Sequence, residues 1–117
     1  MFQAYQTKGT AYMVIESRGS IMGGGGFAPL QGGPADTCEL RKMYFRPSMR
    51  GLGMGQKLMG QLLAAAKSSG YKKIYLETLN HMDRAVALYE SYGFERLTRP
   101  RGNTGHHTCN RWYERAL

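Results

Sequence analysis

The stretch RPSMRGLGMGQKLMGQLL, residues 46–63, carries Gly51, Gly53 and Gly55 at alternate positions, directly before leucines and methionines at helical spacing. Glycine is costly inside a helix, so three glycines at a helix start need a reason. Glycine lets backbone N–H groups crowd against a ligand, and the first helical turn offers unpaired N–H donors and a partial positive charge. The stretch therefore predicts a site for a pyrophosphate, with a plain flexible turn as the alternative.

Two common phosphate motifs do not fit this stretch. The P-loop ends in Gly-Lys-Ser/Thr, a tripeptide that the sequence lacks. The dinucleotide pattern GxGxxG fails from Gly51 because Gln56 stands at its last position, and it fails from Gly53 because Leu58 does. The remaining candidate is the run RGLGMG, in which an arginine adds a charge-assisted contact to the anion. Its members are Arg50, Gly51, Leu52, Gly53, Met54 and Gly55.

Working outward from the glycines, periodicity predicts one α/β domain over residues 1–117. Short β-branched and aromatic runs indicate strands, and the four glycines of residues 23–26 indicate a bulge or a close backbone approach. Leucines and alanines at i, i+4 and i+7 indicate an amphipathic helix. The expected elements are strands at 9–17, 21–30 and 37–45, a helix at 54–69, a strand at 72–78, a helix at 83–92, and strands at 94–99 and 109–117. The fold class is a mixed sheet in which antiparallel N-terminal hairpin strands continue into a β-α-β-α-β-β part.

Composition limits the partners. A net charge of +8 predicts a polyanion, such as a phosphorylated small molecule or nucleic acid. No basic block is interleaved with aromatics, so nucleic acid is the less favoured partner. No apolar run is long enough for a bilayer and no signal-peptide layout is present, so a cytoplasmic protein without a membrane partner is expected. Cys38 and Cys109 lack a metal-type spacing, so no metal is expected.

Two segments resemble the GNAT superfamily of N-acetyltransferases. ELRKMYFRPSMRGLGMGQKLM, residues 39–59, is similar to its acetyl-CoA signature, whose R/Q-x-x-G-x-G/A pattern is met by Arg50, Gly53 and Gly55. AVALYESYGFERL, residues 85–97, resembles a second motif of the form A-x-x-L-Y-x-x-x-G-F. The resemblance implies transfer of an acetyl group from acetyl-CoA, as co-substrate, to a primary amine of a small molecule or protein by direct attack.

The resemblance also implies where the coenzyme lies. In the family, the strand before the glycine loop carries a bulge and splays from the next parallel strand, which leaves a V-shaped slot for the pantetheine arm. Here the main chain of Met43, Tyr44 and Phe45 would pair with that arm. The run from Arg50 to Gly55 would hold the pyrophosphate.

Three side chains are candidates for catalysis. Tyr89 matches the motif tyrosine that protonates the coenzyme sulfur in many members, although its helical spacing also fits a core residue. Glu39 and Glu77 match places where family members carry the base, and Glu39 is put slightly ahead because an acid in so basic a segment is otherwise unexplained. An ion pair of Glu39 with Arg41 or Lys42 is the alternative.

The sequence departs from the family in two places. Met82 stands where many members carry an asparagine that touches pantetheine. Only about eight residues precede the strand expected at 9–17, so the usual first strand and helices are expected to be lacking. Because an open sheet edge invites pairing, a homodimer is expected.

The acceptor amine is not readable from the residues. The segment RPRGNTGHHTCNRWY, residues 99–113, is expected on the acceptor side, where Arg101 would attract a carboxylate-bearing amine. Two other functions stay open: a coenzyme-binding module without catalysis, and, less favoured, a basic nucleic-acid-binding protein.

Overall fold

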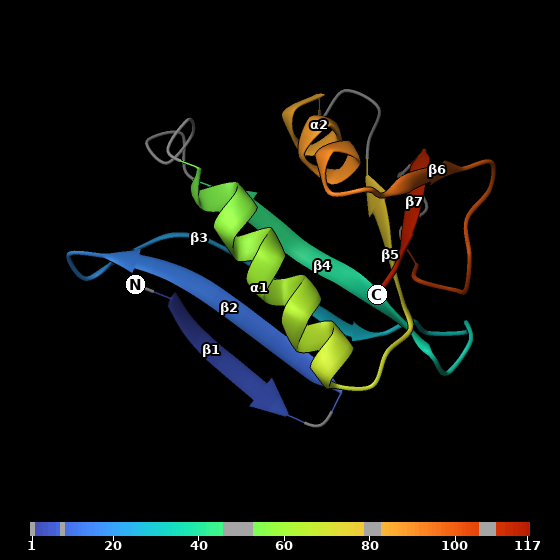
Figure 1. The fold of residues 1–117 in the computed structure, drawn as a ribbon, viewed down its shortest axis with the longest axis horizontal. Coiled ribbons are helices and arrows are strands. Elements are labelled where there is room, and N and C mark those ends of the chain that lie inside the picture. Colours follow the sequence, from blue (N-terminus) through green and yellow to red (C-terminus); the bar gives the residue numbers. More distant parts are fainter. Residues whose placement is uncertain (1, 8, 46–52, 79–82, 106–109) are drawn as a thin grey trace.

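A computed structural model describes residues 2–7, 9–45, 53–78, 83–105 and 110–117, and these form one seven-stranded sheet and two helices (Figure 1). The strands lie in the order β1-β2-β3-β4-β5-β7-β6, and only β4 and β5 run parallel. The elements are β1 (Phe2–Thr7), β2 (Thr10–Ser17), β3 (Ser20–Pro29), β4 (Thr37–Phe45), α1 (Met54–Ser68), β5 (Lys73–Thr78), α2 (Asp83–Ser91), β6 (Glu95–Leu97) and β7 (Arg111–Ala116). The expected mixed sheet is confirmed, and the strand expected at residues 37–45 is β4.

The first strand corrects the sequence analysis. No strand was expected before residue 9, yet Phe2–Thr7 forms β1 and pairs antiparallel with β2 from Phe2↔Ile15 to Thr7↔Thr10. The physical reason is that the edge of β2 offers unpaired N–H and C=O groups, and a segment joined to it by a tight connection satisfies them even with modest strand propensity. The sheet therefore has a first strand, and its edge on that side is β1 rather than β2.

The last two strands are shorter than expected. The strand expected at 94–99 is β6, Glu95–Leu97, and the one expected at 109–117 is β7, Arg111–Ala116. β6 is an edge strand that pairs with β7 from Glu95↔Glu114 to Leu97↔Trp112, so residues 98 and 99 fall outside the ladder.

β4 bulges and then leaves β5. Gly24 pairs with Tyr44 and Gly26 with Arg41, so two residues of β4 face Gly25 alone. A Cβ on Gly25 would lie 2.6 Å from the Met43 sulfur, which explains glycine at this place. The parallel pairing of β4 with β5 covers only Thr37↔Lys73, Cys38↔Ile74 and Glu39↔Tyr75, and the two strands then diverge (Figure 1). Both the bulge and the splay implied by the family resemblance are confirmed.

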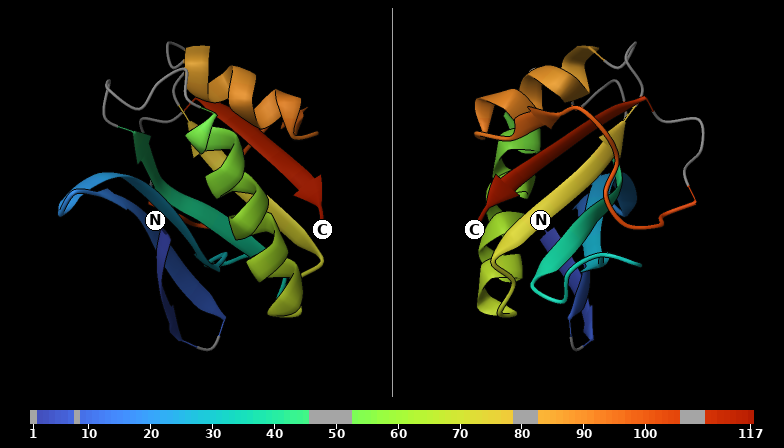
Figure 2. Two further views of the ribbon diagram at one scale, coloured as in Figure 1. Left: turned by 60° about the vertical axis from the view of Figure 1, so that its left-hand side comes forward. Right: turned by 90° about the vertical axis from the view of Figure 1, so that its right-hand side faces the viewer.

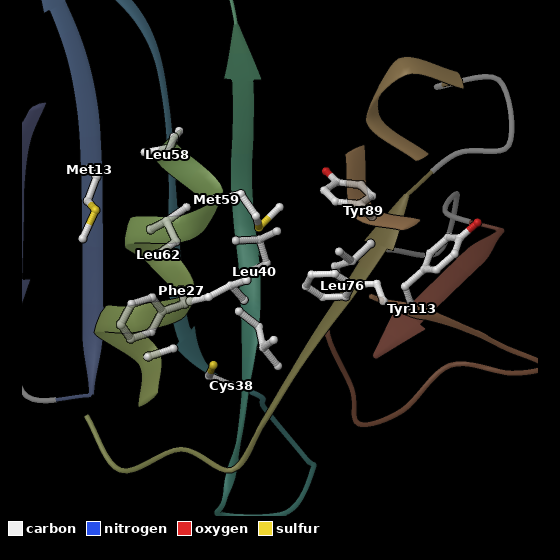
Figure 3. Close-up of a cluster of buried hydrophobic side chains, with 14 of the residues drawn as sticks. Met13, Phe27, Cys38, Leu40, Leu58, Met59, Leu62, Leu76, Tyr89 and Tyr113 are labelled. Atoms are coloured by element: carbon white, nitrogen blue, oxygen red, sulfur yellow. The ribbon is translucent and has the colours of Figure 1, made fainter. Parts of the chain in front are cut away.

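The core fills the space between one face of the sheet and the two helices. α1 crosses β2, β3 and β4, while α2 lies beside β5 and β7 (Figures 1 and 2). Figure 3 shows part of this cluster, whose buried members include Met13, Phe27, Cys38, Leu40, Leu58, Met59, Leu62, Leu76, Tyr89 and Tyr113. Since strand side chains alternate, Glu39, Tyr75 and Glu77 fall on the opposite face of the sheet. Within the described residues, no helix combines the length and apolar character that a bilayer crossing requires.

Candidate active site

The two candidate carboxylates lie on one face of the sheet, joined by a tyrosine that sequence reasoning missed. Glu39 stands opposite Tyr75 in the parallel register of β4 and β5. The Tyr75 hydroxyl donates a hydrogen bond of 2.5 Å to Glu77 Oε2. Burial, the hydrogen bond to Glu77 and the charge of Glu39 together raise the pKa of Tyr75 well above its usual range. The Y-x-E spacing of β5 was the signal, since residues two apart on a strand share a face.

Glu77 is also held from outside the sheet. Thr104 donates its hydroxyl proton to Glu77 Oε1. Glu77 is half-buried at the penultimate position of β5, near the end of the strand where β4 and β5 lie apart. Both of these donors are hydroxyl groups, and they bind different oxygens of the carboxylate.

Glu39 has a different environment. Its side chain is 1% exposed, and its Oε1 lies 2.7 Å from Arg41 Nε in an ion pair. The ion pair with Arg41 that the sequence offered as an alternative is therefore present. A buried carboxylate needs such a partner, because an isolated buried charge is very costly.

Tyr89 is buried on the helix side of the sheet. Its ring packs edge-on against Phe94, with centroids 5.9 Å apart, and contacts Tyr113 at 6.5 Å. Figure 3 shows it beside the diverging ends of β4 and β5. Burial raises the pKa of Tyr89 to about 12, so the hydroxyl stays protonated at neutral pH. Within the described residues the hydroxyl has no hydrogen-bond partner, which fits both a core ring and a donor awaiting a ligand.

The predicted coenzyme residues fall into two groups. On β4, Gly23 pairs with Phe45 and Gly24 with Tyr44, so the main chain is bound on the β3 side. On the β5 side, pairing between described residues ends at Glu39, which leaves that edge of β4 open. Met43 packs against the core and the Tyr44 side chain is 45% exposed. Arg50, Gly51 and Leu52 lie outside the described residues.

The described part of the glycine run begins α1. Gly53 is the N-cap residue with φ 72°, a left-handed conformation that explains why glycine is needed there. The first helical bond runs from the Lys57 N–H to the Gly53 carbonyl. The N–H groups of Met54, Gly55 and Gln56 have no intrahelical acceptor because they lie in the first turn of the helix. No side chain caps this turn, and it contains no acidic residue.

An open groove of about 630 Å³ runs along α1 from this N-terminus. Its far wall is Tyr92, whose hydroxyl donates to the Gln56 carbonyl. The lining residues are Gly53, Gln56, Lys57, Gly60, Gln61, Ala64 and Tyr92. Sequence reasoning missed Lys57, although its place one turn after the glycine run was a readable signal.

Arg101 stands in the segment that the sequence placed on the acceptor side. Its Nε lies 3.0 Å from Glu114 Oε1 in an ion pair, and its backbone N–H donates to the Tyr75 hydroxyl at 3.0 Å. Thr104 of the same segment contacts Glu77, and the role of Arg101 toward an acceptor stays a prediction. Met82 and Cys109, together with the three histidines of the chain, lie outside the described residues.

Sequence comparison finds one family over most of the chain. The model described as the Acetyltransferase (GNAT) family matches residues 2–94. An uncharacterized N-acetyltransferase of Escherichia coli K12, YjgM, is 46% identical over 109 residues, which cover 93% of this chain and 65% of that protein. The chain thus spans just under two thirds of the length of this relative.

Solved structures share the fold. An acetyltransferase of the GNAT family from Staphylococcus aureus Mu50 matches with a TM-score of 0.82 at 26% identity, over 94% of this chain and 69% of that one. The putative acetyltransferase yncA from Salmonella typhimurium, solved with its cofactor acetyl-CoA, matches with a TM-score of 0.73 at 21% identity. That match covers 93% of this chain and 65% of the other.

Proposed function

We propose that this chain, which belongs to the GNAT family of acetyltransferases, transfers the acetyl group of acetyl-CoA to a primary amine. The observation that carries the proposal is the divergence of β4 from β5 after Glu39, which opens a main-chain edge at the N-terminal end of α1. An open strand edge suits a pantetheine arm, whose amides pair as a strand does. A helix N-terminus without an acidic residue suits a pyrophosphate.

The coenzyme is accommodated in three parts. The pantetheine arm pairs with the main chain of Met43, Tyr44 and Phe45 on the open side of β4. The pyrophosphate lies against the N–H groups of the run from Arg50 to Gly55. The groove along α1 takes the nucleotide end, where Lys57 supplies a cation for its phosphates.

The base is better assigned to Glu77 than to Glu39. Arg41 pairs with Glu39, which is 1% exposed, whereas two hydroxyl groups donate to Glu77 at a half-buried place. The amine gives a proton to Glu77 and attacks the thioester carbonyl. A C–N bond forms, the C–S bond breaks, and Tyr89 donates a hydrogen bond to the departing sulfur.

Calorimetric titration with acetyl-CoA tests the coenzyme site. Gly53→Asp adds a negative charge at the start of α1 and strains a left-handed residue, so binding should be lost. Gly70→Asp is the matched control, because Gly70 follows the other end of α1 with φ 95° and equally open surroundings. Equal binding by both variants would place the coenzyme elsewhere.

Turnover is then measured as thiol release with a panel of amines. Release that depends on the amine supports the transferase, whereas tight binding without release on any amine would leave only a coenzyme-binding module. The acceptor panel should include amines with and without a carboxylate, because the sequence hypothesis for Arg101 favours the former.

A homodimer remains a prediction of the sequence. In the described part of the chain, the sheet has two edges that a second copy could pair with, β1 and β6. Sedimentation at high concentration that returns a single 13.1 kDa species would exclude it.

A further inference from the structure

We infer that Tyr75 and Thr104 are positioning residues that clamp Glu77, so that the segment of residues 98–105 is part of the catalytic apparatus. The inference rests on the proposed function. Its observation is that each oxygen of one carboxylate receives a hydroxyl from a different element: Oε2 from Tyr75 on β5, and Oε1 from Thr104 in the segment between β6 and β7.

The clamp has a fixed direction of proton donation. The Arg101 backbone N–H donates to the Tyr75 hydroxyl oxygen at 3.0 Å, so that oxygen accepts one bond while its own proton goes to Glu77. A chain of donors that all point the same way polarises each member. The chain of hydrogen bonds thus runs from the Arg101 backbone N–H through the Tyr75 hydroxyl to the Glu77 carboxylate.

The segment itself is anchored at three further places. Arg101 pairs with Glu114 of β7, and the Asn103 N–H donates to the Gln31 carbonyl at 2.6 Å. Gly102 lies so close to Gln31 that a Cβ there would come within 2.6 Å of the carbonyl oxygen. These contacts are independent of Glu77, so the Thr104 hydroxyl is presented to Glu77 by a segment that is already fixed.

The clamp suits a general base. The two hydroxyls bind different oxygens of the carboxylate, so they fix the orientation of the Glu77 side chain. A base must be held in the attacking geometry, because a displacement of about 1 Å costs about 100-fold in rate. The charged groups facing this site are Glu39 and Arg41 on β4, Glu114 on β7 and Arg101 in the segment.

The test compares Thr104→Val, which keeps the shape and removes the hydroxyl, with Thr104→Ser, which keeps the hydroxyl. Thr104→Val should lower kcat/KM for the amine by about 10- to 100-fold and move the acid limb of its pH profile to higher pH, since a donor to the charged carboxylate is gone. Tyr75→Phe should act in the same direction. Thr104→Ser should restore the parent profile, and the affinity for acetyl-CoA should stay constant throughout.

Two measurements separate the clamp from a purely structural role and from the proposed function. Thr37→Val removes another buried threonine hydroxyl, one that donates to Asp36 rather than to Glu77, so it should leave the pH profile in place. If Thr104→Val lowers only thermal stability and leaves the profile unmoved, the clamp is overturned. If the parent has no turnover, the proposed function fails, and the side-chain carboxyl ¹³C chemical shift of Glu77 decides the clamp: a shift that is the same in the parent and in Thr104→Val would overturn it.

Discussion

Tyr75 donates a 2.5 Å hydrogen bond to Glu77, its neighbour two residues along the same strand, and this contact distinguishes the two acidic residues of the site. Glu39, opposite Tyr75 in the next strand, is paired instead with Arg41. One carboxylate is thus balanced by a guanidinium and the other is held by hydroxyl groups. The proton that leaves the amine therefore has a more accessible acceptor in Glu77, which is half-buried, than in Glu39, which is 1% exposed and paired.

Glu77→Gln and Glu39→Gln should therefore fail in different ways. Glu77→Gln should lower kcat by about 10²- to 10⁴-fold with little change in acetyl-CoA affinity, as expected for loss of a general base. Glu39→Gln should lower the melting temperature, because Arg41 loses its partner. Initial rates of thiol release and thermal melts on both variants check this. If Glu39→Gln is stable but has no turnover, while Glu77→Gln is active, then Glu39 is the base, as the sequence slightly favoured.

Tyr89→Phe should lower kcat by about 100-fold without shifting the basic limb of the pH profile. The pKa of Tyr89, raised by burial to about 12, exceeds that of a thiol at about 8.5. Full proton transfer to the thiolate is uphill, so Tyr89 acts as a hydrogen-bond donor and does not ionise in the working range. Steady-state rates from pH 6 to 10 check this. A basic limb that disappears in Tyr89→Phe would mean that the hydroxyl ionises much lower.

The sequence predicted those helices and strands whose signal is local or belongs to a motif. The alternation of residues 37–45 and the apolar stripe of α1 predicted their elements within one residue. β1 was missed because its formation depends on pairing with β2 rather than on its own pattern.

The site was less readable because its contacts are nonlocal. Tyr75 lies two residues before Glu77, so their shared face followed from strand alternation. Thr104 is 27 residues away from Glu77, and nothing in its local pattern indicates that contact. The sequence offered an ion pair of Glu39 with Arg41 or Lys42 as an alternative to a base, and only the structure shows that Glu39 pairs with Arg41.

Lys57→Ala should weaken acetyl-CoA binding by about 5- to 10-fold, and more in low salt, because it removes one exposed cation beside a phosphate. Lys67→Ala is the matched control, since Lys67 is exposed in the last turn of the same helix, away from the groove. Titrations of both variants at two salt concentrations check this. Equal losses in both variants would show a general charge effect rather than a contact in the groove.

Alkaline conditions should destabilise the protein through Cys38. Burial raises the pKa of the Cys38 thiol from 9.0 to about 12, so the folded chain keeps a proton that the unfolded chain releases. Between these values the unfolded state binds fewer protons, so the free energy of unfolding falls as pH rises from about 9 toward 12. The buried tyrosines add to the fall above about pH 10.

Cys38→Ala isolates the contribution of the thiol. The variant should be less stable at pH 7, because the fully buried side chain leaves a small cavity, but its stability should decline less between pH 8.5 and 10. Urea unfolding of both proteins at several pH values measures the difference. A gap between parent and variant that stays constant across this range would show that the thiol titrates alike in the folded and unfolded chains.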